Sequence, residues 1–555
     1  MIHSRSILEL STAKGREMRL CLLRLVVGLT IGAFCFARAV EVCADGRPNV
    51  LLIMADDMRP WLGAYGESGL RTPHLDRLAD AGLVFERAYC QNAVCGPSRA
   101  SLLTGLRPDT TRIFDNDTHF RTHNPSIVTL PQLFREHGYR TQAIGKIFHP
   151  SFAQAYVGAR MDDLPSWSEP TWYPPPQYYH TGSGMALAES IFLRHPGCGM
   201  YQGATCMHNR LQEAAELTPA QRSLYGGGEW KRHFVQAALC EAPDVPDNEL
   251  GDGQIADRAI EALQQMKGKP FFLAVGFLRP HVPFVAPKKY WDLYQREAFS
   301  PVRNGKAPAN LSRATYPAMH DHGAYEGAPP EGPLDDDKAR ELMHGYAACV
   351  SFVDAQAGRV LEELKRLGLA ENTIVVFLGD HGYHLGENGR WGKQTCYETA
   401  TRAPLIVSAP GTKAAGKHTK ALVEFVDLFP TLCELAALPA PERLEGSSFA
   451  RLLDTPERPW KRATFSQFPD PVRVSRPEVL AAPGDLMGRT IRTDRYRLIV
   501  WEHVLDPAKV EEVELYDYVS DPGETTNIAD DPAQAETLAA MMSILREGWR
   551  GSVPP

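Results

Sequence analysis

The stretch Asn49-Val-Leu-Leu-Ile-Met-Ala-Asp-Asp57 indicates the fold class. Its apolar residues run without interruption and end at two acidic residues, a pattern typical of a strand buried on both faces of a parallel sheet. Thr373–Leu378 is a second run of this kind, and it ends in Gly379-Asp380-His381. Further strands are expected at 141–145, 270–276 and 404–408, and helices at 72–82, 129–138, 253–266, 338–367 and 423–435. This alternation predicts a doubly wound α/β domain, with a mixed, mostly parallel sheet between helices.

The pattern changes toward the C-terminus. Residues 490–501 and 513–518 alternate in hydropathy like half-buried antiparallel strands, and 533–549 has the periodicity of a last helix. We therefore predict a catalytic domain over 47–437 and a smaller C-terminal α+β subdomain with an antiparallel sheet over 438–555.

The N-terminal residues have the features of a secretory signal peptide. Basic residues precede an apolar run over 25–36, and Ala37-Arg38-Ala39 offers a cleavage site flanked by small residues. The run is shorter than the roughly 20 residues that span a bilayer, which argues against a membrane anchor. We predict a signal peptide over 1–39 and export to the periplasm or the medium, with either Met1 or Met18 as the start.

The composition also limits the function. A net charge of −8 argues against a general nucleic-acid binder, and 44% hydrophobic residues fit an ordinary globular protein. Residues 151–247 show no periodicity, so we expect surface loops that shape a substrate cleft. Cys198, Cys206 and Cys240 lie in this stretch, and an oxidising compartment would permit a disulfide between two of them, with the pairing left open.

Acidic and imidazole side chains follow both buried strands. Asp56 and Asp57 end the first strand, and Asp380 and His381 follow the second. Because the carboxyl ends of parallel strands meet at one edge of a sheet, we expect these four side chains to converge. Three carboxylates repel one another unless a cation neutralises them, and oxygen ligands favour Ca²⁺ or Mg²⁺. The alternative is that each pair is ordinary turn chemistry at a strand end.

A cysteine belongs to the same group of candidates. In Val94-Cys-Gly-Pro-Ser-Arg-Ala-Ser-Leu-Leu-Thr-Gly105, Pro97 suits the first turn of a helix. Cys95 is predicted to lie just ahead of the helix N-terminus, where backbone amides favour an anion. Cationic side chains near this residue and after other strands would form an oxyanion site suited to sulfate or phosphate. They are Arg99, Lys146, His149, His281 and Lys393. Taken singly, the two lysines are also typical of a solvated surface, and His281 of a hydrogen-bonded loop.

The stretch around Cys95 resembles the signature of type I sulfatases, C-x-P-S-R followed by x-x-x-L-T-G. The iduronate-2-sulfatase-like branch of this family is similar over residues 49–60, 107–112, 145–150, 270–284, 379–393, 466–469, 515–517 and 521–524. The resemblance is weakest over 151–240 and 300–335. It implies an alkaline-phosphatase-like fold and the hydrolysis of sulfate esters of sugars, such as 2-O-sulfated uronic acid residues of a polysaccharide.

The resemblance also implies a modified residue. In this family a formylglycine-generating or sulfatase-maturing enzyme converts the signature cysteine to Cα-formylglycine. One hydroxyl of the hydrated aldehyde attacks sulfur, and the second lets the sulfo-enzyme intermediate eliminate sulfate. The implied ligands of Ca²⁺ are Asp56, Asp57, Cys95, Asp380 and His381.

The other implied roles concern charge and protons. Arg99 and Lys146 would stabilise the nucleophile and the developing charge, and His149 would be the base of the elimination step. His281 and Lys393 would bind the sulfate, and one of them would protonate the leaving alcohol.

Two positions depart from the family pattern. Gly96 stands where Ser, Thr, Ala or Val is usual, and Tyr383 stands where the iduronate enzymes have a Trp that faces the sugar. The second departure leaves the sugar specificity open. Two rival functions also remain: a phosphatase or phosphonate monoester hydrolase of the same superfamily, and a catalytically silent glycan-binding relative.

Overall fold

The computed structural model describes residues 46–116, 118–149, 163–174, 238–302, 305–311, 334–469 and 485–554, with isolated residues 180, 186 and 325. The predicted signal peptide, Cys198 and Cys206 lie outside the described residues, whereas Cys240 carries a free thiol. Among the described residues, none of the helices combines the length and the hydropathy that a membrane span needs.

A seven-stranded sheet forms the centre of the large domain. In spatial order its strands are β13 (Lys417–Thr419), β2 (Leu83–Phe85), β12 (Leu405–Ser408), β8 (Thr373–Gly379), β1 (Asn49–Asp56), β6 (Phe271–Pro280) and β4 (Arg140–Gly145). The β4, β6, β1 and β8 strands run parallel to one another, whereas β12 runs antiparallel to β8 and to β2. The predicted mixed, mostly parallel sheet is therefore confirmed.

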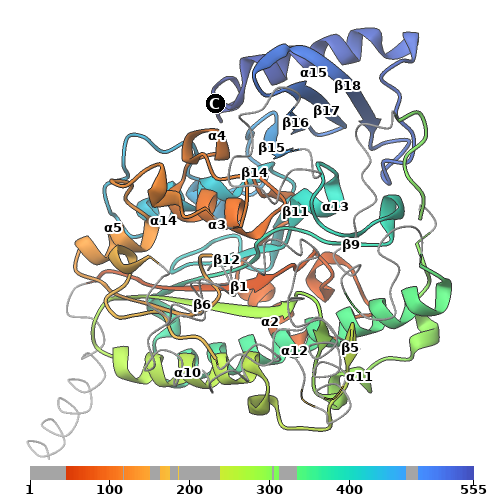
Figure 1. Cartoon of the computed structure of the whole chain (residues 1–555). Helices are drawn as coiled ribbons and strands as arrows, with labels where there is room; N and C mark the ends of the chain where they lie inside the picture. Colours follow the sequence, from red (N-terminus) through yellow and green to blue (C-terminus); the bar gives the residue numbers. More distant parts are fainter. Residues whose placement is uncertain are drawn as a thin grey trace, which may run out of the picture.

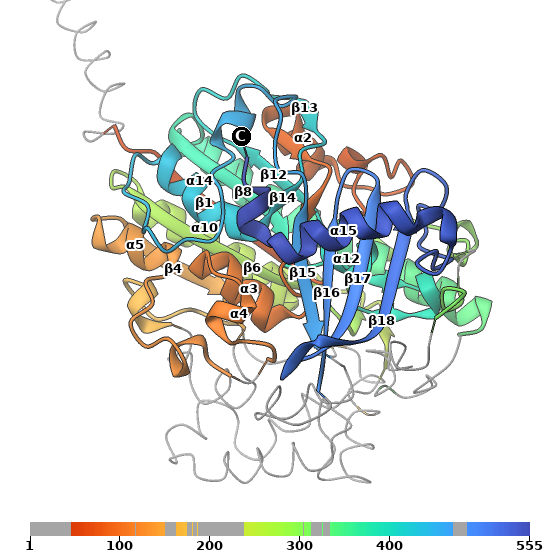
Figure 2. The same ribbon diagram turned by 90° about the horizontal axis from the view of Figure 1, so that it is seen from above.

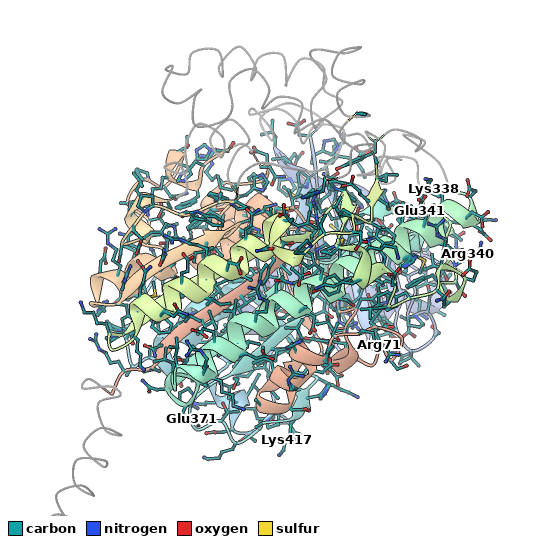
Figure 3. The ribbon with its side chains drawn as sticks, turned by 90° about the horizontal axis from the view of Figure 1, so that it is seen from below. Arg71, Lys338, Arg340, Glu341, Glu371 and Lys417 are labelled. Atoms are coloured by element: carbon teal, nitrogen blue, oxygen red, sulfur yellow. The ribbon has the colours of Figure 1, made fainter. Side chains whose placement is uncertain are left out.

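Helices cover both faces of this sheet (Figure 1). On one face lie α2 (Pro73–Ala81), α10 (Gly251–Met266) and α12 (Asp336–Arg366), and Figure 3 shows these helices together on that face. On the other face lie α3 (Cys95–Thr104), α5 (Leu130–Glu136) and α14 (Leu428–Leu435). Alternate residues of β1 enter the two hydrophobic cores, which explains why its apolar run has no polar interruption.

The C-terminal part carries a separate antiparallel sheet. Its strands are β15 (Thr464–Pro469), β16 (Leu486–Arg492), β17 (Tyr496–His503) and β18 (Asp506–Asp517). The α15 helix (Ala535–Glu547) crosses these strands (Figure 2) and packs on them through a hydrophobic cluster that contains Met541. A second cluster joins Phe468 and Trp501 to Val94, the residue before Cys95. The boundary between residues 437 and 438 stays a prediction.

Short elements complete the described part of the fold. They are α4 (Pro108–Thr111), α11 (Lys288–Trp291), α13 (Glu398–Thr401), β3 (Ala88–Tyr89), β5 (Cys240–Glu241), β7 (Phe284–Val285), β9 (His384–Leu385), β10 (Trp391–Gly392), β11 (Arg402–Ala403) and β14 (Val423–Glu424). The predicted helix over 423–435 was wrong at its start. The β14 strand pairs with β3, and the side chains of Glu424 and Asp427 cap the turn that leads into α14.

Candidate active site

The ends of β1 and β8 meet, as the sequence predicted. The backbone amide of Asp57 donates to Asp380 Oδ1 at 3.0 Å, and that of Asp380 donates to the carbonyl of Ala55 at 3.2 Å. The side chains of Asp56, Asp57, Asp380 and His381 are all buried, and Asp57 has a left-handed backbone with φ of 62°. These two strand ends therefore bring three carboxylates and an imidazole into one buried cluster.

Cys95 belongs to the same cluster and lies in the first turn of α3 rather than ahead of the helix. Its Sγ lies 3.3 Å from His381 Nε2 and 3.9 Å from Asp57 Oδ1. Ser98 Oγ donates to the carbonyl of Asp380 and ties the helix to the β8 end. Burial, together with the carboxylate of Asp56, raises the pKa of the Cys95 thiol well above its usual value. Burial and the nearby carboxylate thus oppose ionisation of the Cys95 thiol.

Three cations pair with the three carboxylates. Arg99 donates from Nη2 to Asp56 Oδ1 at 3.0 Å and from Nε to Asp380 Oδ2 at 2.9 Å, so it joins the two strand ends. Lys146 Nζ lies 2.6 Å from Asp56 Oδ2. Lys393 Nζ lies 2.6 and 2.8 Å from the two oxygens of Asp57. Burial alone would raise the pKa of Asp56, but Lys146 and Arg99 hold that pKa well below its usual value.

Two further histidines belong to the site. His281 Nε2 lies 3.9 Å from Asp57 Oδ2, and its side chain is 30% exposed, more than those of Lys393 and Asp57. The His281 ring is oriented by a contact of 2.7 Å between Nδ1 and the carbonyl of Val282. Burial lowers the pKa of His281 despite the nearby Asp57. Burial and the charge of Lys146 also hold the pKa of His149 well below its usual value, which suits a neutral base.

The ligand-type atoms are close enough to share one metal ion. Asp56, Cys95 and Asp380 offer atoms that all lie within 4.8 Å of one another, and so do Asp57, Cys95 and His381. The carboxylate oxygens fit a hard divalent cation. Because three cationic side chains already balance the three carboxylates, a divalent ion would give the cluster a net positive charge. That charge suits an anionic ester substrate.

The structure brings together all the predicted site residues and adds others that the sequence did not reveal. Asn116 Oδ1 accepts a hydrogen bond of 2.8 Å from the amide of Gly96, and Tyr346 binds the Asp57 turn. Ser98 stood within the quoted signature, but no local pattern pointed to Asn116 or Tyr346. Tyr383 is 1% exposed and its ring stacks on that of Tyr346, so it belongs to the core rather than to a sugar-binding surface.

The burial of Cys95 beside carboxylates and cations suits a hydrolase of anionic esters. The family model for sulfatases matches residues 48–438, and that of the N-sulphoglucosamine sulphohydrolase C-terminal domain matches 386–549. The chain is 34% identical to iduronate 2-sulfatase of Mus musculus and 33% to that of Homo sapiens, in each case over 93% of this chain and 98% of the relative. This chain therefore belongs to the sulfatase family, and it is a sulfuric ester hydrolase.

A solved structure supports the fold. Phosphonate monoester hydrolase of Agrobacterium radiobacter superposes with a TM-score of 0.67, at 23% identity, over 91% of this chain and 96% of that chain. At this identity the likeness concerns the architecture alone. The predicted α/β fold of the sulfatase and alkaline-phosphatase type is confirmed.

Proposed function

We propose that this protein is an exported sulfatase that removes sulfate from sulfated sugars, and that 2-O-sulfated uronic acid residues are its substrates. The convergence of Cys95 with three buried carboxylates and three buried cations carries the proposal. The full-length similarity to iduronate 2-sulfatases supports the sugar class. Export would follow from the signal peptide predicted over residues 1–39, and the mass of the mature N-terminus from the native host tests it.

We further propose that the resident ion is Ca²⁺ and that Cys95 is converted to Cα-formylglycine by a maturation enzyme. Asp56, Asp57, Asp380, His381 and the converted residue would hold Ca²⁺, which would neutralise charge on the sulfate oxygens. The hydrated aldehyde would supply the nucleophile and a second hydroxyl for release of sulfate. An unmodified cysteine would lack the second hydroxyl, so it could be sulfated but could not release sulfate by this elimination.

The remaining residues take distinct parts in the proposed reaction. Arg99 and Lys146 hold Asp56 ionised and face the developing negative charge. His149, neutral beside Lys146, accepts the proton in the elimination step. Lys393 binds the sulfate group beside Asp57. Each of these assignments uses the protonation state that the local charges favour.

His281 is our candidate for the acid that protonates the leaving alcohol. Lys393 uses Nζ to contact both oxygens of Asp57, whereas His281 is the more exposed of the two and points Nε2 toward Asp57. An anionic sulfate ester beside the ring would raise the pKa of His281 and favour its charged form. His281→Gln should therefore slow sugar sulfates far more than an activated aryl sulfate, whose leaving group needs no proton. An equal loss with both substrates would assign the acid elsewhere.

Cys95→Ala tests the nucleophile, with Cys90→Ala as its matched control. Both thiols are buried, and Cys90 directly follows β3 whereas Cys95 begins α3. We expect Cys95→Ala to abolish turnover with the fold retained, and Cys90→Ala to stay active. Mass spectrometry of the peptide that contains Cys95 provides the direct test. An unmodified thiol in active protein from the native host would rule out the formylglycine mechanism.

The substrate class needs a separate comparison. We expect faster turnover of 4-nitrophenyl sulfate than of 4-nitrophenyl phosphate, and the reverse order would favour the phosphatase alternative. Disaccharides that carry a 2-O-sulfated uronic acid should be desulfated in preference to those that carry a 6-O-sulfated glucosamine. A preference for the glucosamine would overturn the sugar assignment and leave the sulfatase assignment intact.

A further inference from the structure

The conformation of Asp57 needs an explanation. It is a residue with a side chain held in left-handed backbone geometry, with φ of 62°. This geometry sends adjacent carboxylates to different partners: Asp56 contacts Arg99 and Lys146, whereas Asp57 contacts Lys393. A relaxed backbone at Asp57 would turn its carboxylate away from Lys393 and Cys95. Some part of the fold must therefore hold this turn against its intrinsic preference.

Tyr346 of α12 makes hydrogen bonds that hold the turn of Asp57 in this conformation. Its hydroxyl donates to the carbonyl of Asp57 at 2.7 Å and accepts from the amide of Arg59 at 2.9 Å. One hydroxyl thus satisfies two backbone groups on either side of Met58. Because Tyr346 is fully buried, water cannot replace it without a rearrangement of the core.

The ring of Tyr346 is itself held in place by its neighbours. It stacks on Tyr383 with centroids 5.8 Å apart and an interplanar angle of 21°, and it meets the ring of Phe284 edge-on at 5.7 Å. Tyr383 follows His381 by two residues. The ring therefore also packs against the connection that carries the second pair of ligand-type residues.

The side chain of Arg59 reinforces this link. Its Nη1 donates to Glu387 Oε1 at 2.7 Å and to the carbonyl of Tyr383 at 3.3 Å. The turn after β1 is thus tied both to α12 and to the segment after β8. These contacts hold the two sets of candidate ligands at a fixed separation.

We propose that Tyr346 is a positioning residue that sets the metal affinity of the site by holding the Asp57 turn in its left-handed form. The inference rests on the calcium site proposed above. Tyr346 acts through the backbone of Asp57, and its side chain has no place among the ligands. Groups that orient ligands in this way typically contribute 10- to 100-fold in metal affinity.

Tyr346→Phe removes one oxygen and keeps the ring, and Tyr65→Phe is its matched control. Tyr65 is also a tyrosine whose hydroxyl binds backbone groups, since it accepts from the amide of Leu405 at 2.8 Å and donates to the carbonyl of Phe85 at 3.0 Å. Its partners lie on β2 and β12, and neither of them belongs to the turn of Asp57. Both variants lose the same chemical group, so a difference between them reports on position and not on lost stability.

The measurement is calorimetric titration of metal-stripped full-length protein with CaCl₂, accompanied by melting curves. We expect Tyr346→Phe to weaken Ca²⁺ binding at least about tenfold and Tyr65→Phe to leave it unchanged, with both variants folded. Excess CaCl₂ should restore 4-nitrophenyl sulfate turnover in Tyr346→Phe. Equal affinities of wild type and Tyr346→Phe would overturn the role of Tyr346 alone. Absence of binding in the wild type would overturn the calcium site, and this inference with it.

Discussion

Lys461 connects the C-terminal sheet to the large domain through buried charges, and its removal should be costly. Its Nζ lies 2.8 Å from Glu424 Oε2 and 2.6 Å from Asp427 Oδ1, and its side chain is 3% exposed. Lys461→Met keeps the approximate length of the side chain but removes the charge. Arg107 still pairs with Glu424 at 2.8 Å in this variant, so Asp427 is the carboxylate that loses its cationic partner. Breaking one partner of a buried ion pair costs about 3–5 kcal/mol.

The assay is guanidinium chloride unfolding followed by tryptophan fluorescence, with Lys413→Met as control. Lys413 lies 3.5 Å from Asp454 in an exposed pair, and such pairs contribute little. Burial already raises the pKa of Asp427 despite Lys461, so in Lys461→Met this carboxyl should take up a proton readily. The stability deficit of Lys461→Met should therefore shrink as the pH falls from 7 to 5. Equal unfolding midpoints for the two variants at pH 7 would refute the reasoning.

Two further changes test other parts of the structure. Glu514 accepts hydrogen bonds from Tyr397, Trp501 and Tyr516, and burial raises its pKa to about 7. A raised pKa means that Glu514 stabilises the fold below its unfolded pKa and loses this contribution as the pH rises through 7. Glu514→Gln should therefore flatten the fall in melting temperature between pH 5 and 8, and an unchanged slope would contradict this assignment. A Cβ at Gly96 would lie 2.6 Å from the carbonyl oxygen of Asp115. Gly96→Ala should therefore displace the adjacent Cys95 and lower kcat by up to about 100-fold. Gly69→Ala is the control, because a Cβ at Gly69 meets open space, and it should leave kcat unaltered.

The central strands could be predicted from sequence because only a strand buried on both faces accepts an uninterrupted apolar run. The β1 and β8 strands begin and end within about two residues of their predicted limits. Because the carboxyl ends of parallel strands meet at one edge of a sheet, the sequence also predicted that Asp56 and Asp380 lie together. Both features could be predicted because an apolar run and the acidic residues at its end are local patterns of a few residues.

Other features depend on partners that are remote in sequence. The helical periodicity over 423–435 misled at its start, because β14 pairs with β3 and Lys461 engages Glu424 and Asp427. Tyr346 is another such case. Its place in the helical pattern of α12 predicts only a core residue. The carbonyl that its hydroxyl contacts lies 289 positions earlier in the chain. Residues that act through the backbone of another segment leave no local pattern.

The position of β1 between β6 and β8 also bears on how the chain is made. Asp57 and Asp380 touch, yet 323 residues separate them. At the usual rates of synthesis, 5–20 residues per second, roughly 15 to 60 s pass between the emergence of one and of the other. During this interval β1 lacks a neighbour for one of its edges, and Cys95 is not yet enclosed by His381 and Lys393. The nascent chain thus exposes for a time a thiol that the finished fold buries, together with an apolar strand edge that needs protection from aggregation.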